Sequence, residues 1–468
     1  MAGTMDERVT QPSPLLSHEE ALGLHNRDEL VRAVAEALAT SQLEDVRTLV
    51  SHLHYSDGAR LFERLSADQR RALIDVMRLD FDAEILCALN GTVREEVIAS
   101  LGFTDLAAAL RELDSDDAVH LMSHLSEDEQ ARVLAALPLE DRAIVTQGLS
   151  YPEYSAGRLM QRELVAVPAY WTVGQTIDYL RESQNLPEEF YDFYVVDPRH
   201  RPAGRVALSR LLQTCQPVRL QEILDPAVQS IAVTMDQEEV AVLFREHDLV
   251  SAPVVDRSGR LVGVVTVDDV VDVIDEEAAD DMLRLGGVAE PDLYRAVIDT
   301  TRSRFNWLLI NLGTAVLTSS VIGLFDAAIE QLVTLAVLMP IVASMGGNAG
   351  TQTLTIAVRA LATRELSAAN AKRVLGKELL VASLNGVLFA VILGVVTWVR
   401  FGIVEISLVI AAALVINLTC AGFAGFLVPL GFERMKIDPA VASPAFVTTV
   451  TDVVGFFAFL GLATWLLL

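Results

Sequence analysis

Cysteine and basic residues are both scarce in this chain of 468 residues, and each shortage excludes a class of function. The three cysteines, Cys87, Cys215 and Cys420, stand far apart with no CxxC pair. This spacing argues against a disulfide framework or a zinc site and is typical of a reducing cytosol. The 36 Lys and Arg residues are outnumbered by 63 Asp and Glu residues. We therefore expect no nucleic acid partner, because its phosphates would be repelled.

Two further signals are missing. No GxxxxGK[ST] phosphate loop occurs, so ATP-driven pumping is not expected, and nothing else indicates an enzyme. The first residues are polar and lack the apolar core of a signal peptide, so we expect residues 1–19 to form a disordered tail.

The negative charge is confined to one part of the chain. Residues 301–468 contain 10 Lys and Arg against 8 Asp and Glu, whereas residues 1–300 carry a net charge of −29. An acidic surface of that density suits divalent cations. The chain thus combines an acidic, soluble part with a nearly neutral, apolar part.

Residues 20–148 show apolar positions at helical spacing, broken by short polar turns. Ser66 stands three residues before Gln69, and Ser126 three residues before Glu129, which is the signature of a capping box at a helix start. This pattern predicts a helical, superhelical N-domain that acts as an interaction module.

An internal repeat of about 59 residues follows. The sequence ValValAsp occurs at 195–197 and 254–256, and Gly204 and Gly263 follow each copy at the same distance. Each copy predicts strand, turn, strand and helix. This resembles a tandem pair of cystathionine-β-synthase (CBS) domains, which we place at 150–222 and 223–275.

CBS domains often bind adenosine nucleotides, so the resemblance implies ATP as a regulator. Thr266 and Asp269 of the second copy are similar to the pair that contacts ribose and phosphate in that family. Ala207 and Arg210 occupy the same places in the first copy. At most one nucleotide site is therefore expected to be intact.

Residues 268–300 predict an acidic connecting helix, or plug helix, between the soluble part and the apolar part. Asp269, Asp272, Glu276 and Asp280 recur every three or four residues on one face. Like charges at that spacing destabilise a helix unless something neutralises them. The face is either solvated or used to bind cations.

Residues 301–468 predict an all-α transmembrane domain, because they contain five apolar runs long enough to cross a bilayer. The runs lie at about 305–325, 331–358, 379–399, 406–432 and 442–468. Basic residues cluster before the first run, between the second and third, and between the fourth and fifth. The positive-inside rule therefore predicts a cytoplasmic N-terminus and a C-terminus outside the cell.

Asp452 lies alone within the last apolar run. A carboxylate at bilayer depth is costly unless it faces protein or water, so it indicates a functional site. Thr448 lies one turn earlier on the same face. These groups offer only oxygen ligands, which Mg²⁺ prefers, and the run contains no His, Cys or Met for a softer metal. The alternative is an Asp bonded to a neighbouring helix.

The second run contains GlyGlyAsnAlaGlyThrGln at 346–352. Its glycines let other backbones approach closely, and Asn348 and Gln352 can present amide oxygens to a hydrated ion or to another helix. A helix-packing face explains the pattern equally well.

The order of domains, together with GlyGlyAsnAlaGlyThrGln, AspProAla (438–440) and ThrThrValThrAsp (448–452), resembles the MgtE family of bacterial magnesium channels. The resemblance implies a multi-pass homodimer in the lipid bilayer of the bacterial inner membrane. Asp452, Asn348 and Thr448 would line the pore, Asp452 would meet its symmetry mate around hydrated Mg²⁺, and Asp438 would lie near the cytoplasmic mouth.

The resemblance also implies that cytosolic Mg²⁺ closes the pore by binding acidic residues of the soluble part. The matching positions are Glu84, Asp236, Glu238, Asp248, Asp269, Asp272, Glu277, Asp280 and Asp281. The sequence departs from the family in the segment 104–110, where Asp105 is the only acid. We therefore expect the contribution of the N-domain to this sensor to be weaker here.

The sequence leaves two other transport mechanisms open. A secondary transporter of Mg²⁺, Co²⁺ or Mn²⁺ coupled to an ion gradient would use Asp452 as a proton relay. A chloride carrier with CBS domains fits poorly, because those domains would follow the membrane part and a lone Asp suits anions badly. The channel is the first hypothesis.

Overall fold

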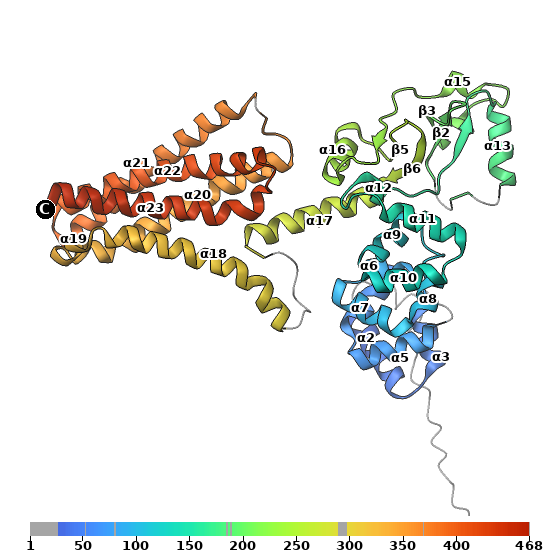
Figure 1. Cartoon of the computed structure of the whole chain (residues 1–468), viewed down its shortest axis with the longest axis horizontal. Helices are drawn as coiled ribbons and strands as arrows, with labels where there is room; N and C mark the ends of the chain where they lie inside the picture. Colours follow the sequence, from blue (N-terminus) through green and yellow to red (C-terminus); the bar gives the residue numbers. More distant parts are fainter. Residues whose placement is uncertain are drawn as a thin grey trace, which may run out of the picture. The chain divides into compact units, whose positions relative to one another are not determined.

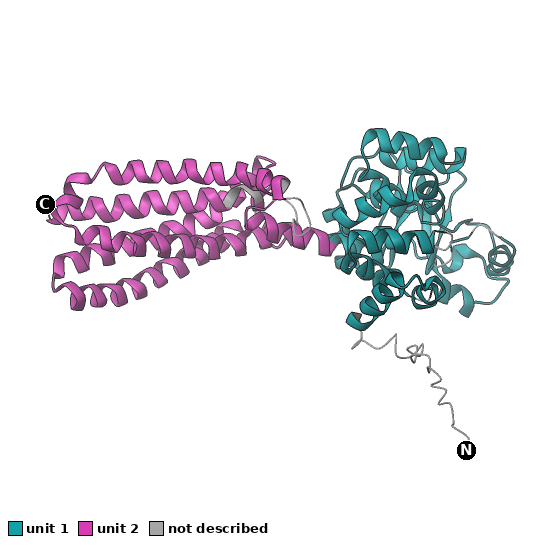
Figure 2. Cartoon of the chain, turned by 90° about the horizontal axis from the view of Figure 1, so that it is seen from below, with its two compact units in different colours: residues 1–273 teal, residues 274–468 magenta. Residues whose placement is uncertain are grey.

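The computed structural model describes residues 27–467 apart from 52, 79–80, 184–185, 188–189, 289–296 and 368, so the predicted tail lies outside the described residues. The chain divides into two compact units, residues 1–273 and residues 274–468 (Figure 2). The first unit contains a helical part and an α/β part, and the second contains only helices.

Short helices form the N-terminal part of the first unit (Figure 1). They are α2 (Arg27–Ala39), α3 (Leu43–Val50), α4 (Tyr55–Arg64), α5 (Ala67–Met77), α6 (Glu84–Ala88), α7 (Gly91–Leu101), α8 (Phe103–Ala109), α9 (Ser115–Ser123), α10 (Glu127–Ala136) and α11 (Leu139–Leu149). Their apolar faces share one core, in which Phe62, Leu73, Leu86 and Met122 are fully buried.

Both predicted capping boxes are confirmed. The Ser66 N–H donates to the side-chain oxygen of Gln69 at 3.0 Å before α5, and the Ser126 N–H donates to the Glu129 carboxylate at 3.0 Å before α10. These bonds satisfy backbone donors that a helix start would otherwise leave without a partner.

Two three-stranded sheets follow. The first sheet contains β1 (Ala166–Pro168), β2 (Asp192–Val196) and β3 (Pro202–Ala207), and the second contains β4 (Ile231–Ala232), β5 (Ser251–Val255) and β6 (Leu261–Thr266). In each sheet the first pair is parallel and the second antiparallel. Short helices accompany the strands: α12 (Ala156–Leu159), α13 (Val173–Glu182), α14 (Leu208–Gln213), α15 (Leu220–Ile223) and α16 (Gln237–His247).

The strand register confirms the predicted repeat. Val195 pairs with Gly204 and Val254 pairs with Gly263, and a bulge follows at the same place in both sheets. Each glycine admits a crossing backbone, because an added Cβ would lie 2.7 Å from the Asp225 carbonyl oxygen at Gly204 and 2.8 Å from the Gln161 oxygen at Gly263.

The acidic helix is shorter than predicted. α17 (Val267–Leu285) ends at two glycines, and Gly287 has a φ of +73°, a conformation that other residues rarely adopt. The first apolar helix is described from Val297 onward, and residues 289–296 of the predicted span lie outside the described residues.

Long helices form the second unit, in which they lie side by side (Figures 1 and 2). They are α18 (Val297–Gly323), α20 (Thr334–Ala362), α21 (Ala371–Phe401), α22 (Val404–Arg434) and α23 (Pro439–Leu467), with the short α19 (Asp326–Gln331) between the first two. α22 packs against α20, α21 and α23.

Four helices of the described chain are long and apolar enough to cross a membrane: Thr300–Gly323, Ala371–Phe401, Val404–Arg434 and Pro444–Leu467. α20 differs because its glycines and polar side chains lower its hydropathy, but its 29 residues span about 43 Å at 1.5 Å per residue. The predicted fold class, with helical, α/β and apolar all-α parts, is confirmed.

Candidate functional site

Asp452 lies in the middle of α23 and is partly buried. Within the described part of the chain its carboxylate has neither a hydrogen-bond partner nor an ion-pair partner. The alternative of an Asp bonded to a neighbouring helix of the same chain therefore lacks support. A carboxylate at this depth needs water, a cation or another copy of the chain to stabilise it.

α20 and α23 are antiparallel and in close contact. Val342 shares a core cluster with Phe459, and Leu354 shares another with Val447. Between these clusters, a Cβ added at Gly350 would lie 3.3 Å from the Thr451 side chain. Residue numbers therefore increase along α20 in the direction in which they decrease along α23.

This register places Asn348 level with Asp452 along the helix axes. Asn348 and Gln352 are exposed in the single chain, although they belong to an apolar unit. The Thr448 hydroxyl donates to the carbonyls of Pro444 and Ala445 at 3.0 and 3.1 Å, which leaves its oxygen able to accept or to ligate. The predicted pore residues Asn348, Thr448 and Asp452 thus lie on two adjoining helix segments.

Asp438 does not belong to that group. It precedes α23 and accepts from the Ala440 N–H at 2.8 Å, about 21 Å along the helix from Asp452 at 1.5 Å per residue. Its second oxygen accepts from the Arg284 guanidinium, which also donates to Asp280 at 3.1 Å. Asp438 therefore joins the acidic end of α17.

Acidic side chains gather at that end of α17, apart from the pore residues, in a group that we call the mouth cluster. Its members are Glu277, Asp280, Asp281 and Asp438, with Arg284 among them. Burial raises the pKa of Asp281 above its ordinary value, and the carboxylates of Asp438 and Glu277 raise it further. The single guanidinium of Arg284 thus neutralises only part of the charge of these carboxylates, and the mouth cluster keeps a net negative charge.

A third group of acids, the N-domain cluster, lies within the first unit. Asp116 and Asp117 on α9 lie near Asp269 at the start of α17, and Glu84 on α6 and Asp272 on α17 add their charges. Asp116 is only 8% exposed. Its Oδ1 is buried and has no hydrogen-bond partner in the described residues.

Burial is the main cause of raised pKa values in this cluster. It raises the pKa of Asp117 to about 6 and that of Asp269 to about 7, and it raises the pKa of Asp116 well above its ordinary value. The mutual repulsion of the carboxylates adds to each shift. A proton or a cation is needed to neutralise the group.

Sequence reasoning missed Asp116 and Asp117. It judged the N-domain from Asp105, which lies on α8 and is held by Arg78 at 2.7 Å. The expectation of a weaker N-domain contribution considered only the segment around Asp105, and it stays a prediction. Two acids in the first turn of a helix are common, so only their burial distinguishes them.

The remaining predicted sensor acids lie elsewhere. Asp236 precedes α16 and accepts from the Glu238 N–H at 3.0 Å, whereas Asp248 ends that helix in a left-handed conformation. All three are exposed, and the helix separates the two ends by about 16 Å. In the described residues, no three acidic, His or Cys side chains are arranged to hold a metal.

The structure brings together the predicted nucleotide pair: the Thr266 hydroxyl donates to Asp269 at 2.6 Å. Asp269 is however also part of the N-domain cluster. A shallow cavity of about 440 Å³ lies instead by the first CBS copy, lined by Phe190, Tyr191, Asp192, Ala207, Leu208, Ser209, Leu212 and Val250.

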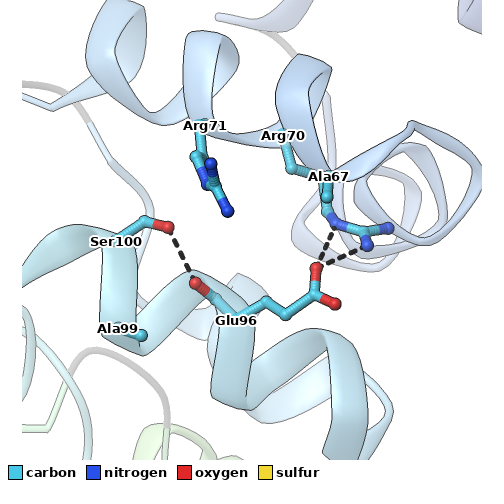
Figure 3. Close-up of a pocket in the computed structure, with 6 residues that line it drawn as sticks. All are labelled: Ala67, Arg70, Arg71, Glu96, Ala99 and Ser100. Carbon is cyan, nitrogen blue, oxygen red and sulfur yellow. Dashed lines mark hydrogen bonds and ion pairs between the residues drawn. The ribbon is translucent and has the colours of Figure 1, made fainter. Parts of the chain in front are cut away.

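Another hollow, of about 260 Å³, lies on the N-domain between α5 and α7 (Figure 3). Arg70 lines it, but its guanidinium already donates to the Glu96 carboxylate and to the carbonyls of Phe62 and Leu65. This arrangement leaves little capacity to bind an anion, so we regard the contact as structural.

Three family models match the chain. A model described as a divalent cation transporter, MgtE, matches residues 339–462, the MgtE intracellular N domain matches residues 53–154, and a CBS domain matches residues 220–276. The first of these matches contains the segments of Asn348 and Asp452.

Similar proteins cover nearly the whole chain. The magnesium transporter MgtE of Thermus thermophilus is 33% identical over 94% of this chain and 99% of its own length. The magnesium transporter MgtE of Bacillus subtilis is 27% identical over 93% and 97%. A solved cytosolic domain of the Mg²⁺ channel MgtE in complex with ATP is 33% identical over 52% of this chain and 99% of its own, with a TM-score of 0.49.

Proposed function

Because this chain belongs to the MgtE family of divalent cation transporters, we propose that it is a channel for Mg²⁺ uptake through the bacterial inner membrane. The observation that carries the proposal is the carboxylate of Asp452, which has no partner in the described chain and lies level with Asn348. Asn348 and Thr448 add neutral oxygens at the same depth.

The chemistry of these groups favours a hydrated divalent ion. Mg²⁺ keeps several waters and is commonly held by one or two carboxylates, so amide and hydroxyl oxygens need contact only its waters. Co²⁺ and Mn²⁺ accept the same ligands, and their permeation is therefore part of the test.

A homodimer completes the proposed site. One chain supplies a single carboxylate, and its exposed Asn348 and Gln352 would be badly placed against lipid. A second copy related by a two-fold axis would supply another Asp452 and cover these polar side chains. The two carboxylates would then face one ion.

We further infer that cytosolic Mg²⁺ closes the channel. The N-domain cluster and the mouth cluster both hold more carboxylates than cations, and the buried Oδ1 of Asp116 is an acceptor without a partner in the described residues. A cation that binds the closed form more tightly shifts the equilibrium towards closure by that difference in affinity. Asp236, Glu238 and Asp248 are the remaining proposed sensor positions.

The distribution of basic residues supports an orientation with the acidic part in the cytoplasm. ATP is proposed as a regulator at the CBS domains. The exposed ring of Tyr191 and the apolar cavity beside it offer a surface for an adenine, whereas Thr266 and Asp269 offer polar contacts in the second copy.

Currents through the purified chain in a planar bilayer test the proposal. The wild type should pass Mg²⁺, Asp452→Asn should abolish the current, and Asp326→Asn on α19 should leave it intact. A flux that depends on a pH gradient would instead indicate a coupled carrier. Normal Mg²⁺ current through Asp452→Asn would refute the pore assignment.

A further inference from the structure

Asn417 is a polar side chain in the interior of the membrane unit. It lies in the middle of α22 and is fully buried. Its Nδ2 donates to the Val342 carbonyl of α20 at 2.9 Å. A side-chain hydrogen bond to the backbone of a neighbouring helix fixes both the distance and the register of the two helices.

Two glycines make room for this side chain. A Cβ added at Gly346 of α20 would lie 2.3 Å from Nδ2 of Asn417, and one added at Gly455 of α23 would lie 2.6 Å from the same atom. Asn417 therefore touches both helices that carry the proposed pore residues. Each glycine is less than one helical turn from a proposed ligand, Asn348 on α20 and Asp452 on α23, whereas Val342 lies six residues, about 9 Å, from Asn348.

Packing alone does not explain an asparagine here. Its Oδ1 is buried and accepts no hydrogen bond from the described residues. A leucine of similar size would fill the space without burying an unpaired acceptor, but it would remove the hydrogen bond to the Val342 carbonyl. The donor function of the amide is therefore the property that distinguishes Asn417 from an apolar residue.

We propose that Asn417 is a positioning residue that holds the Asn348 segment and the Asp452 segment at one level and so sets the selectivity of the pore. The inference rests on the proposed Mg²⁺ conduction. Loss of its bond to Val342 would let α20 shift against α22, and therefore against α23, which Asn417 contacts at Gly455. The amide and carboxylate oxygens would then no longer act on the same hydrated ion.

The test compares Asn417→Leu with Asn385→Leu, a matched change at an exposed asparagine of α21. Currents carried by Mg²⁺ and by Ca²⁺ are measured through each purified protein. Asn417→Leu should lower the Mg²⁺/Ca²⁺ permeability ratio about fivefold, the factor expected for one interhelical hydrogen bond, while Asn385→Leu keeps the wild-type ratio. Asn417→Ser, which keeps a donor, should recover part of the ratio.

An unchanged ratio in a folded Asn417→Leu protein overturns the inference, even if the total current is smaller. Should that variant fail to fold, Gly346→Ala and Gly346→Ala/Asn417→Ser decide. Gly346→Ala alone should lower both the melting temperature and the Mg²⁺/Ca²⁺ permeability ratio, because its Cβ would collide with the Asn417 amide. The smaller serine of the double variant should restore both quantities, and a double variant that restores neither overturns the inference. A wild type without Mg²⁺ current would refute the proposed function instead.

Discussion

The guanidinium of Arg284, in the last turn of α17, donates to the carboxylate of Asp438, which directly precedes α23. The bond ties the acidic helix to the start of the helix that carries Asp452. Leu285 adds an apolar contact, because it packs against the cluster of Leu354, Ala440 and Val447. The C-terminal part of α17, from Ile274 onward, is thus coupled to α23 by groups within one unit.

Removing Arg284 should favour opening. In Arg284→Gln the carboxylates of Asp280 and Asp438 lose their shared cation and repel each other. A partly exposed ion pair contributes up to about 1 kcal/mol, which is roughly a fivefold change in an equilibrium. We expect a larger open fraction without Mg²⁺ in single-channel records. Arg434→Gln, at the exposed end of α22, is the control; equal effects of both changes would contradict the role of Arg284.

Neutralising the acidic face should weaken closure by Mg²⁺. The combined variant Asp269→Asn, Asp272→Asn, Glu277→Gln and Asp280→Asn removes charges from both clusters. The concentration of cytosolic Mg²⁺ at half-closure should rise about tenfold or more, since each hydrogen-bonded charge contributes at least about 1 kcal/mol. Asp105→Asn, whose carboxylate is held by Arg78, should change it little. A quadruple variant that closes at the wild-type concentration would exclude the clusters as sensors.

Stability of the first unit should fall as pH rises. The pKa values of Asp116, Asp117 and Asp269 are raised in the folded chain, so the folded state binds more protons than the unfolded state between about pH 4 and pH 7. The contribution is present below that window and lost as pH rises through it. Melting of the full-length protein at pH 5 and pH 8 should show this loss.

Added Mg²⁺ should reduce that dependence, because a cation replaces the protons. The double variant Asp116→Asn and Asp269→Asn should reduce it as well, whereas Asp68→Asn, on an exposed carboxylate, should not. A steep pH dependence that survives in the double variant would assign the effect to other groups.

The close contact between α20 and α22 should require glycine at position 425. A Cβ at Gly425 would lie 2.6 Å from the Gly350 carbonyl oxygen, and backbone cannot move away as a side-chain tip can. Gly425→Ala should therefore destabilise the membrane unit by about 1–3 kcal/mol and reduce Mg²⁺ current. Gly431→Ala has open space around its Cβ and should melt at the wild-type temperature or above. The melting temperatures of the two purified variants give the comparison.

The sequence alone was enough for the features that local chemistry controls. The capping boxes at Ser66 and Ser126 and the repeat seen in Gly204 and Gly263 follow from hydrogen bonding and backbone space over a few residues. The apolar runs follow from hydropathy, and Asp452 stood out because a charge in such a run is costly.

Only tertiary structure decided which distant groups meet. Asp116 and Asp117 look like ordinary first-turn acids until burial and Asp269 distinguish them. Arg284 meets Asp438 across 154 positions of sequence, and Asn417 meets both Gly346 and Gly455 only because α22 packs against both of their helices. Burial and contacts between helices depend on the whole packed chain, and no short stretch of sequence encodes them.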